Sequence, residues 1–260
     1  MKAIITGASR GIGKGIAISL AKQGYDVYVT GRSKEDLARI RDEIEAIGQT
    51  CAVLPCDHSD MNSTVKLFQS IEDIRFDIIV NNAWGGYERM VENDQYTWEN
   101  KFWEQPDHRW ISMIDVGVRT AFLCSRHCVK KMIEARKGLI VNISFWAARK
   151  YMQNVIYGTS KAAIDKMTSD MAEELKMYDI PVISLYPGLV RTEAVLQNAH
   201  FFNLENSESP EFEGLVIGAL YRDSDKMLKT GKALTSAELA DEYRIVDIDG
   251  KRIREERLVT

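Results

Sequence analysis

The stretch Lys2-Ala3-Ile4-Ile5-Thr6-Gly7-Ala8-Ser9-Arg10-Gly11-Ile12-Gly13 decides the fold of this chain. Its first half is a short apolar strand, and its second half is a glycine-rich turn that leads into a helical pattern over residues 11–23. Glycines in such a turn allow positive φ angles and let a ligand approach the backbone closely. The following helix presents unpaired N–H groups and the positive end of its dipole to a phosphate. The spacing differs from the usual G-x-G-x-x-G fingerprint, but its place after a first strand favours a dinucleotide site over a plain tight turn.

Beyond this turn, short apolar strands alternate with helices that carry an apolar stripe. Ser33 is the expected N-cap of the second helix, and Gly24 and Gly48 follow the ends of the first two helices. Isolated strands joined by helices pair in parallel through crossovers. We therefore predict one α/β domain over residues 1–260, a doubly wound Rossmann fold whose parallel sheet carries helices on both faces. The expected strands are 2–6, 26–30, 50–54, 76–81, 138–143 and 231–234, and the expected helices are 11–23, 33–48, 62–71 and 215–220.

The composition narrows the class of protein. Of the 260 residues, 45% are hydrophobic and 28% are charged, and the formal net charge of −4 gives no basic surface for nucleic acid or for a membrane. No apolar run approaches the ~20 residues that span a bilayer, and the first residues enter a strand pattern too early for a signal peptide. The cysteines match no zinc or disulfide framework, so we expect reduced thiols, no metal site and a cytoplasmic location. They are Cys51, Cys56, Cys124 and Cys128.

A serine, a tyrosine and a lysine in the middle of the chain are the candidate catalytic residues. Tyr157 and Lys161 are four positions apart, so they share one face of a helix. A lysine ammonium beside a phenol favours the phenolate, and such a tyrosine can exchange a proton with an alcohol or alkoxide. Ser144 follows the apolar run 138–143, which places its hydroxyl at the carboxyl end of a buried strand. Taken alone, the tyrosine–lysine pair also fits an ordinary contact within a helix.

The end of the second strand indicates which dinucleotide is bound. An acidic residue at this place would accept hydrogen bonds from the adenosine ribose and repel a 2′-phosphate. The chain instead has Arg32, whose guanidinium suits a 2′-phosphate, and Arg10 is a possible second cation. We therefore predict NADP(H) in preference to NAD(H), with solvated surface arginines as the alternative. Asp57, after the third strand, is placed either to accept from the adenine amino group or to cap the next helix.

Together these motifs resemble the short-chain dehydrogenase/reductase family, from residue 1 to about residue 235. Thr6 to Gly13 is similar to that family's T-G-x-x-x-G-x-G turn, and Asn81-Asn82-Ala83 to its N-N-A-G segment beside the cofactor. The serine, tyrosine and lysine match its catalytic residues, and 187–192 (Pro-Gly-Leu-Val-Arg-Thr) matches its segment beside the nicotinamide. Stretches 100–104, 115–119 and 238–243 resemble one narrower branch of the family. The resemblance implies that the cofactor contacts Gly7, Ser9, Arg10, Gly11, Ile12, Gly13, Arg32, Asp57, Asn82, Ala83, Tyr157, Lys161, Pro187, Gly188, Val190 and Thr192.

Two positions depart from the family pattern. Trp84 stands where N-N-A-G ends in glycine, so its indole must either enter the cleft or repack the end of the sheet. Gly117 stands where many members carry a catalytic asparagine that kinks its helix and holds a water in a proton relay. Glycine can supply the kink through its backbone but offers no amide. Asp115 is nearby but two residues out of register.

The resemblance implies an NAD(P)-dependent oxidoreductase of the carbonyl reductase type, in which the tyrosine is the general acid and base. A catalytically weak nucleotide-binding sensor or scaffold is the alternative, because of the two departures. The aromatic insertion 84–110 holds Trp84, Tyr87, Tyr96, Trp98, Phe102, Trp103 and Trp110, and we expect most of them to pack this loop onto the domain.

The substrate side is predicted from two further segments. Phe145 and Trp146 are candidate pocket residues, and the loop 193–212 follows the nicotinamide segment and is expected to close over the substrate. An apolar pocket favours a hydrophobic ketone or aldehyde, with a 3-oxoacyl thioester as the competing option. The resemblance implies a homodimer or homotetramer. In the C-terminal tail 236–260, the charged part 247–260 either crosses to a partner subunit or lacks fixed structure.

Overall fold

A computed structural model describes residues 1–86, 90–92 and 95–255 of the chain. Its core is a seven-stranded sheet in the order β3-β2-β1-β4-β7-β8-β9, in which each strand runs parallel to its neighbours. The order reverses between β1 and β4, which is where doubly wound sheets bind their ligands. The predicted fold class is therefore confirmed. The strands are β1 (Lys2–Ile5), β2 (Asp26–Gly31), β3 (Cys51–Pro55), β4 (Ile78–Asn81), β7 (Leu139–Ile143), β8 (Val182–Tyr186) and β9 (Ala233–Thr235).

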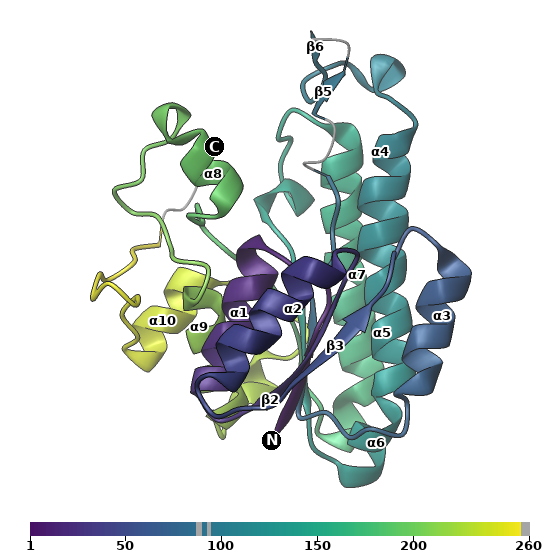
Figure 1. The fold of residues 1–260 in the computed structure, drawn as a ribbon, viewed down its shortest axis with the longest axis vertical. Helices are drawn as coiled ribbons and strands as arrows, with labels where there is room; N and C mark the ends of the chain where they lie inside the picture. Colours follow the sequence, from purple (N-terminus) through teal and green to yellow (C-terminus); the bar gives the residue numbers. More distant parts are fainter. Residues whose placement is uncertain (87–89, 93–94, 256–260) are drawn as a thin grey trace.

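Helices cover both faces of the sheet, as Figure 1 shows. Successive residues of a strand point to opposite faces, so Ala3 and Ile5 pack in one cluster while Ile4 packs in the other. The first cluster lies under α1 (Gly11–Lys22), α2 (Lys34–Glu45), α9 (Phe212–Arg222) and α10 (Ser236–Tyr243). The second lies under α3 (Met61–Ser70), α5 (Thr120–Cys128), α6 (Lys130–Ala135) and α7 (Val155–Leu175).

The helix ends follow the sequence signals closely. The Ser33 hydroxyl accepts a hydrogen bond from the Asp36 N–H at 3.1 Å, so the predicted N-cap of α2 is confirmed. Gly24 and Gly48 have φ angles of 89° and 82°, which favour glycine after a helix. The helix predicted at 215–220 is longer than expected, since α9 begins at Phe212.

The helix before β7 changes its winding midway. It begins as α4 (His108–Trp110), continues as the π-helix η2 (Ile111–Arg119) and ends as α5. Gly117 lies in the π-helical part, so the helix is irregular at the position where the family asparagine kinks it. None of the described helices is both long and apolar enough to cross a bilayer.

Two segments lie above the carboxyl ends of the strands in Figure 1. One is the aromatic insertion, with the short strands β5 (Val91–Glu92) and β6 (Gln95–Tyr96) and the turn η1 (Phe102–Glu104). The other holds α8 (Glu193–Gln197) and η5 (Ala199–Phe201). The insertion's Tyr87 lies outside the described residues.

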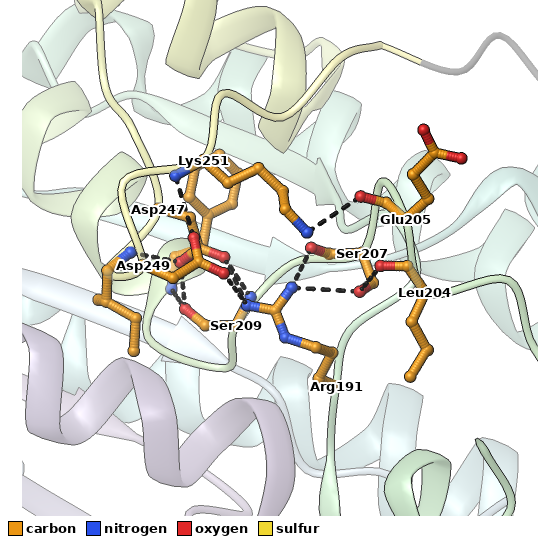
Figure 2. A network of polar contacts seen from close by, with 10 residues as sticks. Arg191, Leu204, Glu205, Ser207, Ser209, Asp247, Asp249 and Lys251 are labelled. Carbon is orange, nitrogen blue, oxygen red and sulfur yellow. Dashed lines mark hydrogen bonds and ion pairs between the residues drawn. The ribbon is translucent and has the colours of Figure 1, made fainter.

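The tail packs onto its own chain over residues 236–255, so the expectation that its charged part lacks fixed structure is wrong for residues 247–255. The crossing to a partner subunit stays a prediction. The first part of the tail is α10, and Asp247 and Ile253 are buried. Figure 2 shows how Arg191 holds this part, through ion pairs at 3.0 Å to Asp247 and at 3.1 Å to Asp249. Residues 256–260 of the tail lie outside the described residues.

Candidate active site

Helix α7 carries the tyrosine and the lysine at the sheet's carboxyl edge. Asn154 caps this helix, because its side-chain oxygen accepts from the Tyr157 N–H at 3.0 Å. Tyr157 and Lys161 follow one turn apart, and both are buried, with exposures of 6% and 7%. The same Asn154 donates its amide N–H to the Trp98 carbonyl at 3.0 Å, which connects the aromatic insertion to the start of α7.

Ser144 meets this helix at the end of β7. Its N–H donates to the Leu185 carbonyl at 2.9 Å, and its hydroxyl donates to the Lys161 carbonyl at 3.3 Å. The next residue, Phe145, stacks on the Tyr157 ring with centroids 6.3 Å apart. The structure thus brings all three candidate catalytic residues to one place.

The ammonium of Lys161 lies in a narrow buried space. It donates to the Ile143 carbonyl at 3.3 Å and lies 6.0 Å from the Tyr157 ring centroid. Burial lowers the pKa of Lys161 to about 8, and the negative charge of Asp165, one turn further along α7, opposes that shift. A lysine with this pKa exists in both charge states near neutral pH, which suits a group that tunes a neighbouring phenol.

The glycine turn after β1 is locked against the end of β4. The Thr6 hydroxyl accepts from the N–H groups of Asn82 and Ala83, both at 3.0 Å. The Asn82 amide donates to the carbonyls of Thr6 and Gly7 at 3.1 and 2.9 Å. Gly7 has a φ of 67°, and a Cβ there would lie 2.6 Å from the Ala83 Cα. Asn82 and Ala83 therefore shape the turn, so only glycine fits at position 7.

A carboxylate of the chain itself occupies the anion-binding end of α1. The Gly11 N–H donates to Oε2 of Glu193 at 3.0 Å. Thr192, whose hydroxyl caps α8, lies against the same glycine, because a Cβ on Gly11 would be 3.4 Å from its Cγ2. The turn can thus hold an anion, which fits the phosphates of a dinucleotide. This contact also brings the two predicted cofactor segments together.

At the end of β2, Arg32 lies near Asp57. Arg10 and Arg32 are both exposed, and the Arg32 charge helps to lower the pKa of Asp57. Partial burial opposes that lowering, while hydrogen bonds from the Ser59 N–H and hydroxyl, at 2.9 and 2.8 Å, favour it. Asp57 does not cap the next helix, because the N-cap of α3 is Asp60, whose side chain accepts from the Asn62 N–H at 2.9 Å. The role of Asp57 in adenine recognition stays a prediction. Ser9 packs against the end of β2, because a Cβ on Gly31 would lie 3.3 Å from the Ser9 Cβ.

The segment 187–192 is held by buried carboxyl groups that the sequence did not indicate. The Gly188 N–H donates to Glu208 at 2.8 Å, and Val190 forms a β-bridge with the same residue. Burial and the nearby Glu213 raise the pKa of Glu208 well above its usual range. Arg191 donates to Ser207 and to Asp247 and Asp249 of the tail, as Figure 2 shows. Glu208 and Glu213 lie in the polar stretch 206–213 together with Glu211, so the sequence gives no sign that these two acids are buried.

Aromatic side chains of the insertion divide into two groups. Trp84 and Trp98 cover the Tyr157 ring, each with its centroid 5.3 Å from the tyrosine's. The expectation that most insertion aromatics pack onto the domain is wrong for four described residues, which remain more than half exposed. These are Tyr96, Phe102, Trp103 and Trp110.

Trp146, a predicted pocket residue outside the insertion, lies beside Tyr186, with 5.5 Å between the ring centroids. It lines a cavity together with Pro187 and Gly188.

Asp115 is held by an arginine of the same helical segment. It forms an ion pair at 2.9 Å with Arg119, which also donates to the carbonyls of His58 and Ser59.

The described residues contain no group of three or more metal-ligating side chains. The four cysteines are buried thiols without disulfides.

The comparisons with known proteins agree on one family. The sequence profile of the short chain dehydrogenases matches residues 1–200. "Dehydrogenase/reductase SDR family member 1" of Mus musculus is 36% identical over 268 residues, covering 97% of this chain and 84% of the relative. This is the branch that the stretches 100–104, 115–119 and 238–243 resemble.

Two solved structures show the same fold with a nicotinamide dinucleotide bound. A 3-oxoacyl-[acyl-carrier protein] reductase with bound NAD from Brucella melitensis has a TM-score of 0.75 at 26% identity, covering 90% of this chain and 88% of that one. A metagenomic short-chain oxidoreductase in complex with NADP has a TM-score of 0.73 at 25% identity, covering 90% and 95%.

Proposed function

Because this chain belongs to the short-chain dehydrogenase/reductase family, we propose that it transfers a hydride between NADP(H) and the carbonyl or alcohol group of a hydrophobic small molecule. The observation that carries the proposal is the convergence of Ser144, Tyr157 and Lys161 beside a glycine turn that already holds a carboxylate. Phosphate recognition and a tuned phenol are the two requirements of this chemistry.

The chain's own residues hold the substrate oxygen and move its proton. The nicotinamide, when bound, supplies or accepts the hydride. The Ser144 hydroxyl and the Tyr157 phenol donate hydrogen bonds to the carbonyl oxygen and stabilise the negative charge that develops on it. Tyr157 gives its proton to the resulting alkoxide, and the Lys161 ammonium makes that phenol more acidic. Trp84 and Trp98 keep bulk water away from the phenol ring.

The preference for NADP(H) is proposed from Arg32. Arg32→Ala is expected to weaken NADPH binding roughly tenfold to a hundredfold, because a charge-assisted contact to the 2′-phosphate is lost. NADH, which lacks that phosphate, should bind within about threefold of the unmodified protein. Titrations of both cofactors, monitored by their fluorescence, measure the difference, and Arg10→Ala tests the second cation. Equal losses for NADPH and NADH would show that Arg32 does not read the phosphate.

Glu193 is expected to compete with the cofactor. Its carboxylate holds the Gly11 N–H that a phosphate would take, so removing its charge should favour binding. Glu193→Gln is predicted to tighten NADPH binding by about threefold to tenfold. Glu174→Gln, at the far end of α7, removes the same charge as a control and should leave affinity unchanged. Weaker binding by the Glu193 variant would mean that the carboxylate helps to hold the cofactor.

The substrate class follows from the surroundings of the phenol. Trp84, Trp98 and Phe145 surround its ring, and such a lining favours an apolar or aromatic ketone or aldehyde over a sugar. The second candidate is a 3-oxoacyl thioester, favoured by the similarity to the Brucella melitensis reductase.

A panel of carbonyl compounds, followed by NADPH absorbance at 340 nm, tests the function. The proposal expects turnover of hydrophobic carbonyl compounds or 3-oxoacyl thioesters. Tight NADPH binding without turnover of any compound would instead favour the sensor or scaffold. Light scattering on the same preparation tests the proposed homodimer or homotetramer, and the buried reduced thiols fit the proposed cytoplasmic location.

A further inference from the structure

Trp84 lies in a cradle formed by two glycines. A Cβ on Gly86 would be 2.1 Å from Cζ2 of its indole, and a Cβ on Gly117 would be 3.0 Å from its Cδ1. Gly86 comes from the same loop, and Gly117 comes from the π-helix η2. A larger residue at Gly86 would displace the indole, and one at Gly117 would press against it, so both glycines keep space open for this ring.

The face of that indole is turned to the catalytic lysine. The Lys161 Nζ lies 5.0 Å from the Trp84 ring centroid, within the ~6 Å over which a cation is attracted to an aromatic face. This is nearer than its distance to the Tyr157 ring, 6.0 Å. Trp84 also contacts the Tyr157 ring at a tilt of 48°. One side chain therefore touches both members of the proposed proton-transfer pair.

Besides the indole face, the Ile143 carbonyl and the Asp165 carboxylate also favour the charged form of Lys161. Its ammonium donates to the Ile143 carbonyl, and the facing titratable groups are Asp165 on its own helix and Tyr157. Burial removes water from the ammonium and lowers its pKa to about 8. Both forms of Lys161 are then populated near neutral pH. A favourable contact from an aromatic face therefore changes the fraction of the lysine that is charged.

We propose that Trp84 is a positioning residue whose indole face holds the Lys161 ammonium in its charged form and in place beside Tyr157. The proposal rests on the proposed function, in which Lys161 makes the Tyr157 phenol more acidic. Trp84 acts through the lysine and exchanges no proton itself. The cradle of Gly86 and Gly117 gives the ring its orientation, so the two departures from the family pattern, Trp84 and Gly117, form one structural unit.

The sharpest test changes the electronic character of the indole and keeps its shape. Mono-, di- and tetrafluorinated tryptophan are introduced at position 84 alone, since each added fluorine weakens the negative potential of the ring face. The ionisation of Lys161 is read from its ε-carbon NMR resonance, assigned by its loss in Lys161→Met. The tetrafluorinated protein should show about a tenfold lower ratio of charged to neutral Lys161 at a given pH. The basic limb of the pH profile of kcat/KM should shift in the same direction.

Trp103 provides the matched control, because it is 68% exposed and contacts Phe102 rather than the catalytic residues. The same series at position 103 should leave the titration of Lys161 unchanged. If fluorination at position 84 leaves the titration of Lys161 unchanged, the proposal is overturned.

A double-mutant cycle tests the cradle separately. Gly117→Ala pushes on the indole and should change the Lys161 titration in the native background but not in Trp84→Leu. Equal effects in both backgrounds would show that Gly117 does not act through Trp84. If the titration shifts in protein that turns over no carbonyl compound, the contact is supported and the proposed function fails.

Discussion

Replacing Tyr157 by phenylalanine is expected to reduce kcat at least about a hundredfold while NADPH still binds. The change removes only the phenolic hydroxyl. The ring that remains keeps its contacts with Trp84, Trp98 and Phe145, so the pocket should hold its shape. Without that hydroxyl the alkoxide formed from the substrate has no positioned proton donor.

Steady-state kinetics with NADPH and an active carbonyl compound measure the loss, and a fluorescence titration measures cofactor binding. Tyr151→Phe is the matched control, since Tyr151 lies in the same segment but is 71% exposed. It should retain nearly full activity. If Tyr157→Phe retained near-normal kcat, another group would have to deliver the proton.

The fold was predictable because its signals are local. Strands buried on both faces read as apolar runs between helices, and caps such as Ser33 mark where helices begin. Even so, the run 76–81 predicted a strand longer than β4, which begins at Ile78. Phe76 is buried in the core without belonging to the strand, so apolar character alone did not fix the boundary.

The site was predictable in its parts but not in its contacts. Spacing placed Tyr157 and Lys161 on one helix face, and the turn after β1 was recognised from its glycines. The contact of Gly11 with Glu193 joins residues 182 positions apart, and no local pattern indicates such a pair. The sequence does not indicate the direction of the Trp84 indole either, because Gly86 and the distant Gly117 determine it together.

The segment 187–192 depends on one buried carboxylate of the tail. Asp247 is 2% exposed and accepts hydrogen bonds from the Ser209 N–H at 2.7 Å and from the Ser209 hydroxyl, besides its ion pair with Arg191. Asp249 shares the same guanidinium, but its side chain is 43% exposed. Figure 2 shows both aspartates on one side of Arg191. The two residues therefore allow a buried and an exposed partner of one arginine to be compared.

Asp247→Ala is expected to lower the free energy of unfolding by about 3 kcal/mol, because it leaves buried donors of Ser209 and part of the Arg191 charge without a partner. The melting temperature should fall by roughly 6–12 °C. Asp249→Ala should cost less than about 1 kcal/mol, since water replaces an exposed carboxylate. Arg191 lies between Val190 and Thr192, which are predicted to contact the cofactor. A change that loosens Arg191 should therefore weaken NADPH binding, more in the Asp247 variant than in the Asp249 variant. Thermal melts with and without NADPH measure both effects, and equal small shifts in the two variants would show that the tail does not hold this segment.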